Sequence, residues 1–117
     1  LDEVMDDSKI AGLTQRTIDR GKEIVSLLGS GSAYFAPSAA IAEITRALAK
    51  NEKRTLGVSA YLNGEYGLKD VCLGVPCRLG KDGIEQIIEL DLNQQEKEAL
   101  LKSASTIKEQ YRAIANV

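Results

Sequence analysis

Apolar residues recur at helical spacing through the first half of the chain. A first helix is predicted over 10–28, with Gly29 as its C-terminal stop, and a second over 33–50. Pro37 suits the first turn of the second helix, because its missing N–H has no helical partner there. Residues 1–9 are mostly polar and are left unassigned, as a loop or as the frayed start of the first helix. The apolar face of the first helix is expected at Leu13, Ile18, Val25 and Leu28.

The apolar period changes to two in the second half of the chain. Strands are predicted over 55–62 and 71–79, each with one buried face, and Asn63–Gly64 gives a turn signal between them. The loop at 80–83 reverses the chain into a third strand over 84–90, so a hairpin is expected here. The inward-facing residues of the first two strands are expected to be Leu56, Val58, Ala60, Leu62, Val71, Leu73, Val75, Cys77 and Leu79.

Pro76 limits how the second strand can pair. Proline has no N–H to donate to a sheet ladder. The strand over 71–79 is therefore expected to lie at an edge, to be bulged at Pro76, or to be paired only on its other side.

A final long helix is predicted to follow Asn93, a favourable N-cap with Glu96 in a capping-box arrangement. Its apolar stripe is expected to cover the sheet or another helix, and a dimer seam is the alternative. The stripe consists of Leu100, Ala104, Ile107, Tyr111 and Ile114. Together these elements predict an α+β fold with long helices packed on a small, mainly antiparallel twisted sheet.

Length and charge limit the classes of function. The 117 residues, of which 44% are hydrophobic, fit one compact domain over 1–117. The net charge of −2, without a block of like charge, argues against nucleic acid or an anionic membrane as a partner. No apolar run approaches the roughly 20 residues that span a bilayer, and the first residues lack a basic and apolar signal region. A soluble protein of the cytoplasm is expected.

The chain has two cysteines and no histidine. Cys72 and Cys77 lie on one predicted strand at an odd spacing, so alternation places them on opposite faces and a disulfide between them is not expected. Without histidine or a CxxC pair no metal site is expected, and buried thiols in a reducing compartment are favoured. The absence of histidine also excludes a histidine general acid or base, and a histidine-containing triad, from this chain.

The stretch 29–44, GSGSAYFAPSAAIAEI, is the best candidate for a ligand-facing surface. Its glycines give backbone freedom, its serines can cap helical N–H groups, and its alanines leave room beside the backbone. An ordinary helix–helix corner is the alternative. A phosphate loop is not favoured, because the Lys–Ser/Thr ending and a preceding strand are missing. Glu65 with Asp70, and Glu85 with Glu89, lie on polar faces, so solvated carboxylates are favoured over an acid–base pair.

Three motifs, which together extend over nearly the whole chain, carry a family resemblance. They are GSAYFAPSAA at 31–40, VSAYLNGEYGLKDVCLGVPCRLGKDGIEQIIEL at 58–90 and EKEALLKSA at 96–104. They resemble the C-terminal part of the lactate/malate dehydrogenase family, and the pairing of the YLNGEYG-like segment with the GVPxxLGxxGIExIIEL-like hairpin is the specific part. Within the family, GSAYFAP is similar to malate dehydrogenases of the lactate-dehydrogenase-like group, whose lactate counterparts usually carry a threonine and a tryptophan near this place.

The resemblance implies hydride transfer between NAD and a 2-hydroxy or 2-oxo acid, with malate preferred over lactate, and a role in the tricarboxylic acid cycle. Residues 1–117 would be the later part of the substrate-binding C-terminal domain. The N-terminal dinucleotide-binding domain, which binds most of the NAD, would lie outside this chain. By the same resemblance Ser32 and Ala33 approach the substrate and Pro37 lies near the nicotinamide. The family also implies a homo-oligomer, a dimer or a tetramer.

The chain departs from the family pattern in its catalytic residues. The Gly-rich dinucleotide motif, the proton-transferring histidine, its orienting aspartate and the substrate-clamping arginines have no matching positions here, since all ordinarily precede this stretch. No catalytic residue is therefore assigned, and the chain alone is expected to be inactive. A non-catalytic interaction or oligomerisation module is the alternative from another class, and what precedes Leu1 would discriminate between them.

Overall fold

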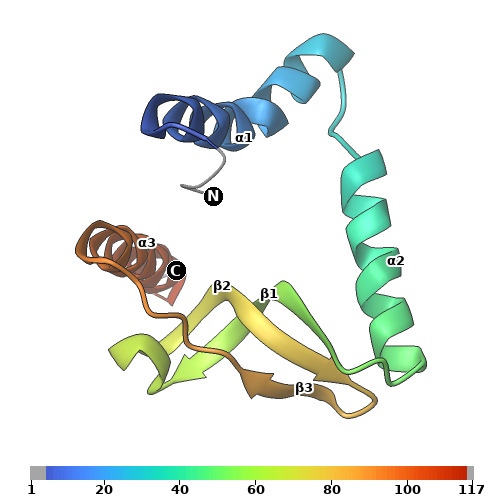
Figure 1. The fold of residues 1–117 in the computed structure, drawn as a ribbon, viewed down its shortest axis with the longest axis vertical. Coiled ribbons are helices and arrows are strands. Elements are labelled where there is room, and N and C mark those ends of the chain that lie inside the picture. Colours follow the sequence, from blue (N-terminus) through green and yellow to red (C-terminus); the bar gives the residue numbers. More distant parts are fainter. Residues whose placement is uncertain (1–4, 116–117) are drawn as a thin grey trace. The chain divides into compact units, whose positions relative to one another are not determined.

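The computed structural model describes residues 5–115 of the chain (Figure 1). The residues group into two compact units, unit 1 (Leu1–Ala42) and unit 2 (Glu43–Val117). None of the described helices combines the length and the apolar character that crossing a bilayer requires. The elements, in chain order, are α1 (Asp7–Leu28), α2 (Phe35–Ala49), β1 (Arg54–Asn63), the 3-10 turn η1 (Glu65–Gly67), β2 (Lys69–Gly80), β3 (Gly83–Ile87) and α3 (Gln94–Ala115).

Helix α1 of unit 1 starts at Asp7, earlier than the apolar pattern predicted. Asp6 is its N-cap, since the carboxylate accepts a hydrogen bond from the Lys9 N–H at 2.9 Å. A carboxylate at this place satisfies a free N–H and complements the helix dipole. The helix ends at Leu28 as predicted, because Gly29 takes a φ of 70°, which other residues rarely adopt. Residues 1–4 of the unassigned segment lie outside the described residues.

The apolar face predicted for α1 is exposed. The four side chains predicted for this face are between 44% and 66% exposed. These side chains are Leu13, Ile18, Val25 and Leu28. No residue of the helix is buried. Unit 1 therefore has no buried core among residues 5–42.

Helix α2 lies within the predicted range of 33–50. Its second half belongs to unit 2, where Ala47 is buried and Ile44 and Leu48 pack against the core. The helix closes with a hydrogen bond from the Glu52 N–H to the Ala47 carbonyl at 2.9 Å. This end of α2 is therefore anchored by the packing of unit 2.

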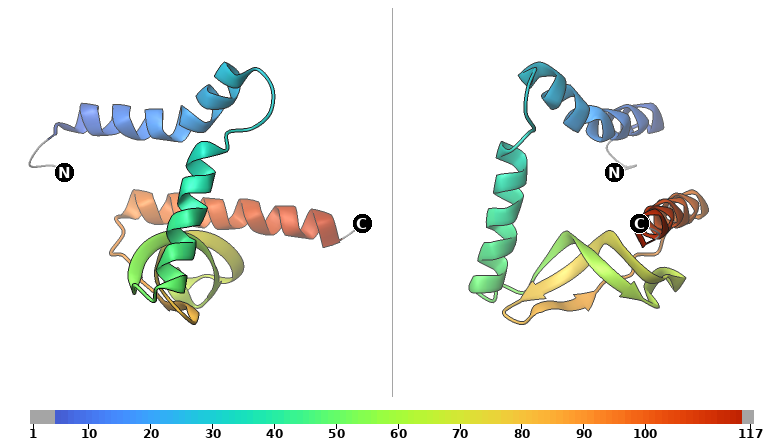
Figure 2. Two further views of the ribbon diagram at one scale, coloured as in Figure 1. Left: turned by 90° about the vertical axis from the view of Figure 1, so that its right-hand side faces the viewer. Right: turned by 180° about the vertical axis from the view of Figure 1, so that it is seen from behind.

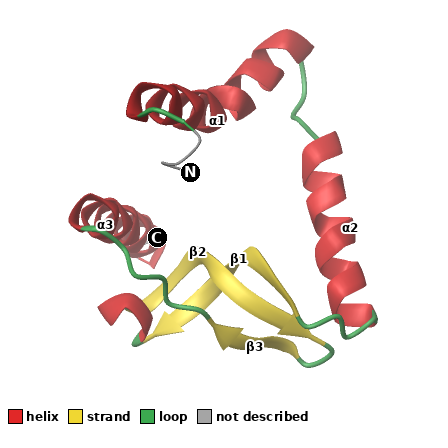
Figure 3. Ribbon diagram, in the orientation of Figure 1, coloured by secondary structure: helices red, strands yellow, loops and turns green. Residues whose placement is uncertain are grey.

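Unit 2 is built around a three-stranded antiparallel sheet in the order β1-β2-β3 (Figure 3). β1 pairs with β2 from Arg54, opposite Leu79, to Asn63, opposite Lys69. The two strands form a strongly twisted ribbon, which is clear from behind in Figure 2. The α+β class with a small antiparallel sheet is thereby confirmed.

The inward-facing row predicted from the alternation forms the core of unit 2. Leu62, Val71 and Cys77 are the largest fully buried side chains. Leu56 and Val58, at the start of the same row, are partly buried against them. Among the residues that the structure describes, the buried hydrophobic residues are Ala47, Ala60, Leu62, Leu68, Val71, Leu73, Val75, Cys77, Leu79 and Ala104.

Pro76 lies in the central strand, so the alternative of an edge strand is wrong. The alternative of pairing only on the other side describes the ladder at this residue, since Pro76 pairs with Gly57 of β1 and the β2–β3 ladder begins at Cys77. Both polar groups of a residue in an antiparallel strand face the same neighbour. The Pro76 carbonyl accepts a hydrogen bond from the Ile88 N–H at 2.8 Å, so the missing N–H faces the β3 side. The regular β2–β3 pairing stops there, at Cys77 opposite Ile87, and its register shift lies further along β2. Proline is tolerated because its missing donor falls where the β2–β3 pairing ends.

β3 is shorter than predicted and ends at Ile87 instead of residue 90. Beyond it, the chain is held by the Tyr66 hydroxyl, which donates to the Ile88 carbonyl at 2.9 Å and accepts from the Leu90 N–H at 3.1 Å. Tyr66 lies in η1 with a φ of 53°. Hydrogen bonds with Tyr66, which is distant in the sequence, thus replace the strand pairing that the apolar alternation predicted for residues 88–90.

A polar clamp joins the segment after α2 to the β2–β3 hairpin. The Asn51 side-chain oxygen accepts a hydrogen bond from the Lys81 N–H at 3.0 Å. Lys53 forms an ion pair with Glu85, whose side chain is only 16% exposed. These contacts satisfy the Lys81 N–H at the turn between β2 and β3, and they join the hairpin to the segment between α2 and β1.

The predicted capping box of α3 is confirmed. The Asn93 side-chain oxygen accepts from the Glu96 N–H at 3.0 Å, and the Glu96 carboxylate accepts from the Asn93 N–H at 2.8 Å. Each side chain therefore satisfies a backbone donor of the other residue.

The apolar stripe of α3 covers the sheet over its first half only. Ala104 is buried, and Leu100 and Ile107 pack against the core. Tyr111 and Ile114 are 47% and 74% exposed. The regular spacing of the stripe predicted its face correctly, but the helix runs past the end of the buried core.

Leu73→Ala should destabilise unit 2 by about 3 kcal/mol, because it opens a cavity in a tightly packed core. Leu73 is 4% exposed, whereas Leu27 is 80% exposed. The matched variant Leu27→Ala should therefore change the free energy of unfolding by less than about 0.5 kcal/mol. Urea unfolding followed by circular dichroism would measure both, and equal effects would contradict the assigned core.

Candidate functional site

The candidate ligand-facing stretch forms the turn between α1 and α2 and the start of α2. Gly29 and Gly31 take positive φ values of 70° and 84°, which glycine adopts without strain. Ser32 is exposed and Ala33 is half-buried. The two residues predicted to approach a substrate are thus neighbours on a short turn with small side chains.

Pro37 lies in the first turn of α2, as predicted. The first helical hydrogen bond runs from the Ser38 N–H to the Tyr34 carbonyl at 2.9 Å, so an N–H at position 37 would have had no helical partner. Pro37 is exposed and presents a rigid apolar ring. Pro37, the residue predicted to lie near the cofactor, therefore lies in the first turn of the helix that follows Ser32 and Ala33.

An exposed aromatic pair lies between these predicted site residues. The ring centroids of Tyr34 and Phe35 are 4.5 Å apart, and the side chains are 59% and 79% exposed. Adjacent rings provide a broad and rigid apolar surface. The sequence analysis did not single out Phe35, although two adjacent aromatics are notable in a chain with only 4% aromatic residues.

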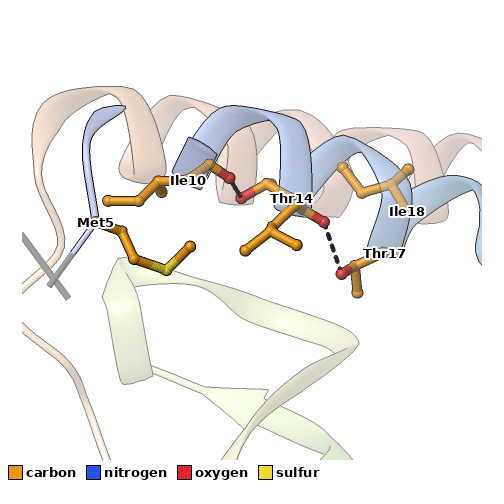
Figure 4. Close-up of a pocket in the computed structure, with 6 residues that line it drawn as sticks. Met5, Ile10, Thr14, Thr17 and Ile18 are labelled. Atoms are coloured by element: carbon orange, nitrogen blue, oxygen red, sulfur yellow. Dashed lines mark hydrogen bonds between the residues drawn. The ribbon is translucent and has the colours of Figure 1, made fainter. Parts of the chain in front are cut away.

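A separate groove of about 300 Å³ lies along α1 (Figure 4). The Thr14 and Thr17 hydroxyls turn back to the helix, where they donate to the Ile10 carbonyl at 2.9 Å and the Leu13 carbonyl at 2.8 Å. Few polar groups remain to orient a small molecule, and the turn residues do not line this groove. Its lining consists of Met5, Ile10, Leu13, Thr14, Thr17 and Ile18.

Unit 2 has a further groove of about 400 Å³ between η1, the segment after β3 and α3. Its Tyr66 hydroxyl is bonded to the backbone on both sides, and its Glu89 carboxylate accepts a hydrogen bond from the Tyr66 N–H. These polar groups therefore serve the fold. The lining consists of Tyr66, Glu89, Leu90, Asp91, Lys97, Leu100 and Leu101.

The carboxylates considered as acid–base pairs make contacts within the fold. Glu65 accepts a hydrogen bond from the Asn63 N–H at 2.7 Å, which lowers the pKa of this carboxyl. Asp70 accepts from the Tyr61 hydroxyl at 2.6 Å. This bond, followed by the charge of Asp70, raises the pKa of Tyr61. Because Glu65 and Asp70 have separate partners, they do not form a carboxylate pair poised for acid–base chemistry.

The two cysteines are free and differ in exposure, in agreement with their predicted placement on opposite faces. Cys77 is fully buried, and burial, followed by the charge of Glu65, raises the pKa of its thiol. Cys72 is partly exposed on the outer face of β2. The interpretation of both as buried thiols therefore holds for Cys77 only.

The turn offers small side chains and hydrogen-bonding hydroxyls but no histidine. The chain contains no histidine. Among residues 5–115, no group of three or more Cys, Asp or Glu side chains is placed to hold a metal ion. The arrangement can form one wall of a binding site, while chemistry on a bound molecule would need groups from elsewhere.

Sequence comparison identifies the kind of protein that this chain resembles. The family model described as the lactate/malate dehydrogenase, alpha/beta C-terminal domain, matches residues 1–117. A malate dehydrogenase from Halalkalibacterium halodurans is 46% identical over 97% of this chain and 36% of its own length. The chain therefore spans little more than one third of the length of this relative.

Solved structures agree with the sequence comparison. A malate dehydrogenase from Salinibacter ruber matches with a TM-score of 0.93 and 43% identity, over 97% of this chain and 37% of that structure. A lactate dehydrogenase from Eimeria maxima, solved with NADH and oxamate, matches with a TM-score of 0.91 and 43% identity, over 98% of this chain and 36% of that structure.

One thiol per chain should react rapidly with a thiol reagent such as Ellman's reagent near neutral pH. Cys72 is accessible, whereas Cys77 is buried and its raised pKa leaves less thiolate at any pH below that pKa. Cys72→Ser should abolish the rapid phase, Cys77→Ser should leave it intact, and denaturant should expose both thiols. Rapid reaction of both thiols in the folded chain would contradict the burial of Cys77.

Proposed function

This chain belongs to the lactate/malate dehydrogenase family, and we propose that it is a segment of an NAD-dependent malate dehydrogenase. The observation that carries the proposal is its 46% identity, over 97% of the chain, with a malate dehydrogenase. The segment would be the later part of the substrate-binding C-terminal domain. The dinucleotide-binding domain would belong to the part of the enzyme outside these 117 residues.

In this proposal the turn before α2 forms the substrate-side wall. The small Ala33 side chain leaves space for a dicarboxylic acid, and the exposed Ser32 hydroxyl can donate a hydrogen bond to a carboxylate oxygen. Pro37 would lie near the nicotinamide, and its exposed apolar ring fits the face of a planar group. NAD, when bound, supplies the hydride acceptor for oxidation of a 2-hydroxy acid. The residues named here would position that acid and exclude water beside it.

The family resemblance implies that a histidine takes the proton from the substrate hydroxyl, and this chain contains no histidine, so the proposal assigns that step to a group outside this chain. The clamps for the substrate carboxylates are likewise unassigned here. This division fits a chain that spans 36% of its malate dehydrogenase relative. The segment would thus contribute shape and specificity, and it would have no activity alone.

Lactate is the second candidate substrate. The Eimeria maxima lactate dehydrogenase is as similar in sequence as the Salinibacter ruber malate dehydrogenase, at 43% identity each. Malate is favoured because GSAYFAP at 31–37 resembles the malate enzymes of this group and because Ala33 leaves more space than a threonine.

For the whole enzyme we further propose a homo-oligomer, a dimer or a tetramer, that works in the cytoplasm and serves the tricarboxylic acid cycle. Two free cysteines fit a reducing compartment. Exposed apolar side chains on both halves of the described chain, such as Leu28 and Ile114, fit a protein that buries more surface in a larger assembly.

The direct test compares the full-length protein with the 117-residue chain in assays of malate- and lactate-dependent NAD reduction. The full-length protein should oxidise malate with a higher kcat/KM than lactate, and the chain alone should be inactive. NADP in place of NAD serves as the cofactor control. A full-length protein that reduces NAD with neither acid would contradict the proposal, and a preference for lactate would select the second candidate.

Substitutions of Ala33 in the full-length enzyme test its place beside the substrate. Ala33→Trp should lower kcat/KM for malate by at least about 100-fold, because a large side chain would occupy substrate space, while NADH binding stays within about threefold. Ala33→Thr should lower the ratio of malate to lactate kcat/KM, and Ala33→Gly should preserve it. Unchanged kcat/KM in Ala33→Trp would remove this turn from the site.

A further inference from the structure

Asn63 and Gly64, which gave the turn signal between the first two strands, are also a chemically reactive pair. They form the only Asn–Gly sequence in the chain. The Gly64 backbone nitrogen can attack the Asn63 side-chain amide carbon, because glycine has no side chain to hinder the approach. The new Cγ–N bond closes a succinimide ring, and the Cγ–Nδ2 bond breaks with loss of ammonia. Water then opens the ring at one of its two carbonyls and leaves aspartate or iso-aspartate.

The structure engages the attacking nitrogen in a hydrogen bond. The Gly64 N–H donates to the Leu68 carbonyl at 2.8 Å. The same turn is closed by a bond from the Gly67 N–H to the Gly64 carbonyl at 3.0 Å. A third bond runs from the Leu68 N–H to the Glu65 carbonyl at 2.9 Å. Attack on the amide requires the Gly64 N–H to leave the Leu68 carbonyl and lose its proton, so the closed turn opposes the reaction.

Asn63 is restrained on its own side of the reacting pair. As the last residue of β1 it pairs with Lys69 of β2, and its N–H donates to the Glu65 carboxylate at 2.7 Å. Leu68, whose carbonyl accepts from Gly64, is 8% exposed and belongs to the core of unit 2. These contacts all lie within residues 63–69, so the restraint on the reacting pair is local to one segment of unit 2.

We propose that Asn63 is a latent deamidation site, which the closed turn protects and which reacts when the turn between β1 and β2 opens. Short segments of a protein open locally without unfolding the rest. Each opening frees the Gly64 nitrogen, and deamidation makes some of these openings irreversible. Iso-aspartate adds a carbon atom to the backbone where the β1–β2 register shifts, between Leu62 and Asn63, so this product cannot restore the same pairing.

Peptide mapping of the full-length protein by mass spectrometry tests the proposal. One sample is incubated folded and one in urea, both at the same mildly alkaline pH, and both are then digested with trypsin. Peptide 55–69 contains Asn63 as its only asparagine, and peptide 82–97 contains Asn93, which precedes glutamine, as the internal control. Conversion of the Asn63 amide to an acid should be at least about 10-fold faster in urea. Asn93 should react much more slowly than Asn63 in urea.

Two matched substitutions test whether the protection is local. Both remove a carboxylate that accepts from an asparagine N–H, Glu65 from Asn63 at 2.7 Å and Glu96 from Asn93 at 2.8 Å. Glu65→Ala should raise the rate at Asn63 in the folded protein about fivefold, because it removes one hydrogen bond of the closed turn. Glu96→Ala should leave that rate unchanged, and neither variant should change the rate in urea.

A third variant tests the attacking group. In urea, where the native turn is absent, Gly64→Ala should slow conversion of Asn63 several-fold because its methyl group hinders the nitrogen. An unchanged rate in this variant would remove Gly64 as the nucleophile.

The remaining outcomes decide the proposal without any assay of dehydrogenase activity. Equal rates at Asn63 in the folded protein and in urea would overturn the protection by the turn. Equal acceleration by Glu65→Ala and Glu96→Ala would overturn its local origin. Because these readouts are peptide masses, they stand or fall separately from the assays that test the proposed function.

Discussion

Burial of one face of the β1–β2 ribbon is the interaction on which the described structure of unit 2 depends. Leu62 of β1 and Val71 and Cys77 of β2 are completely buried, with Ala47 and Ala104 closing the cluster from the two helices. This face also determines the pairing, because a shift of one residue would turn every inward side chain to solvent. The polar contacts at the edges, made by residues such as Tyr66, hold segments that the apolar face has already placed.

In the proposed function this chain contributes to an enzyme without containing its catalytic groups. Glu65 and Asp70, which were weighed as an acid–base pair and not favoured, make separate contacts within unit 2. Ser32, Ala33 and Pro37 lie instead on a turn and a helix start where small side chains leave space. In the proposed function such a segment would shape a site, and the proton transfer would belong to another part of the protein.

Much of this architecture could be predicted from the sequence because local patterns and tertiary packing agree. The alternation in β1 and β2 and the capping box at Asn93 depend on neighbouring residues, so they could be predicted from the sequence. The start of α1 at its Asp6 cap was left open between a loop and the start of the helix, because the apolar pattern begins later. The place of Pro76 in the central strand depends on the pairing of β2 with both neighbours, and the segment after the early end of β3 is held by the contact between Ile88 and Tyr66. Neither is encoded in a local pattern. The site residues were proposed from a family resemblance, since small residues on a turn carry no chemical signature of their own.

The central claim is that this chain forms the substrate-side wall of a malate dehydrogenase. The most direct measurement is a crystal structure of the full-length protein with NADH and a non-reactive dicarboxylic analogue of oxaloacetate. The account predicts that Ala33 lies within about 4 Å of the analogue and that Pro37 packs beside the nicotinamide ring. A bound analogue whose surroundings include neither the turn before α2 nor the start of that helix would contradict the account.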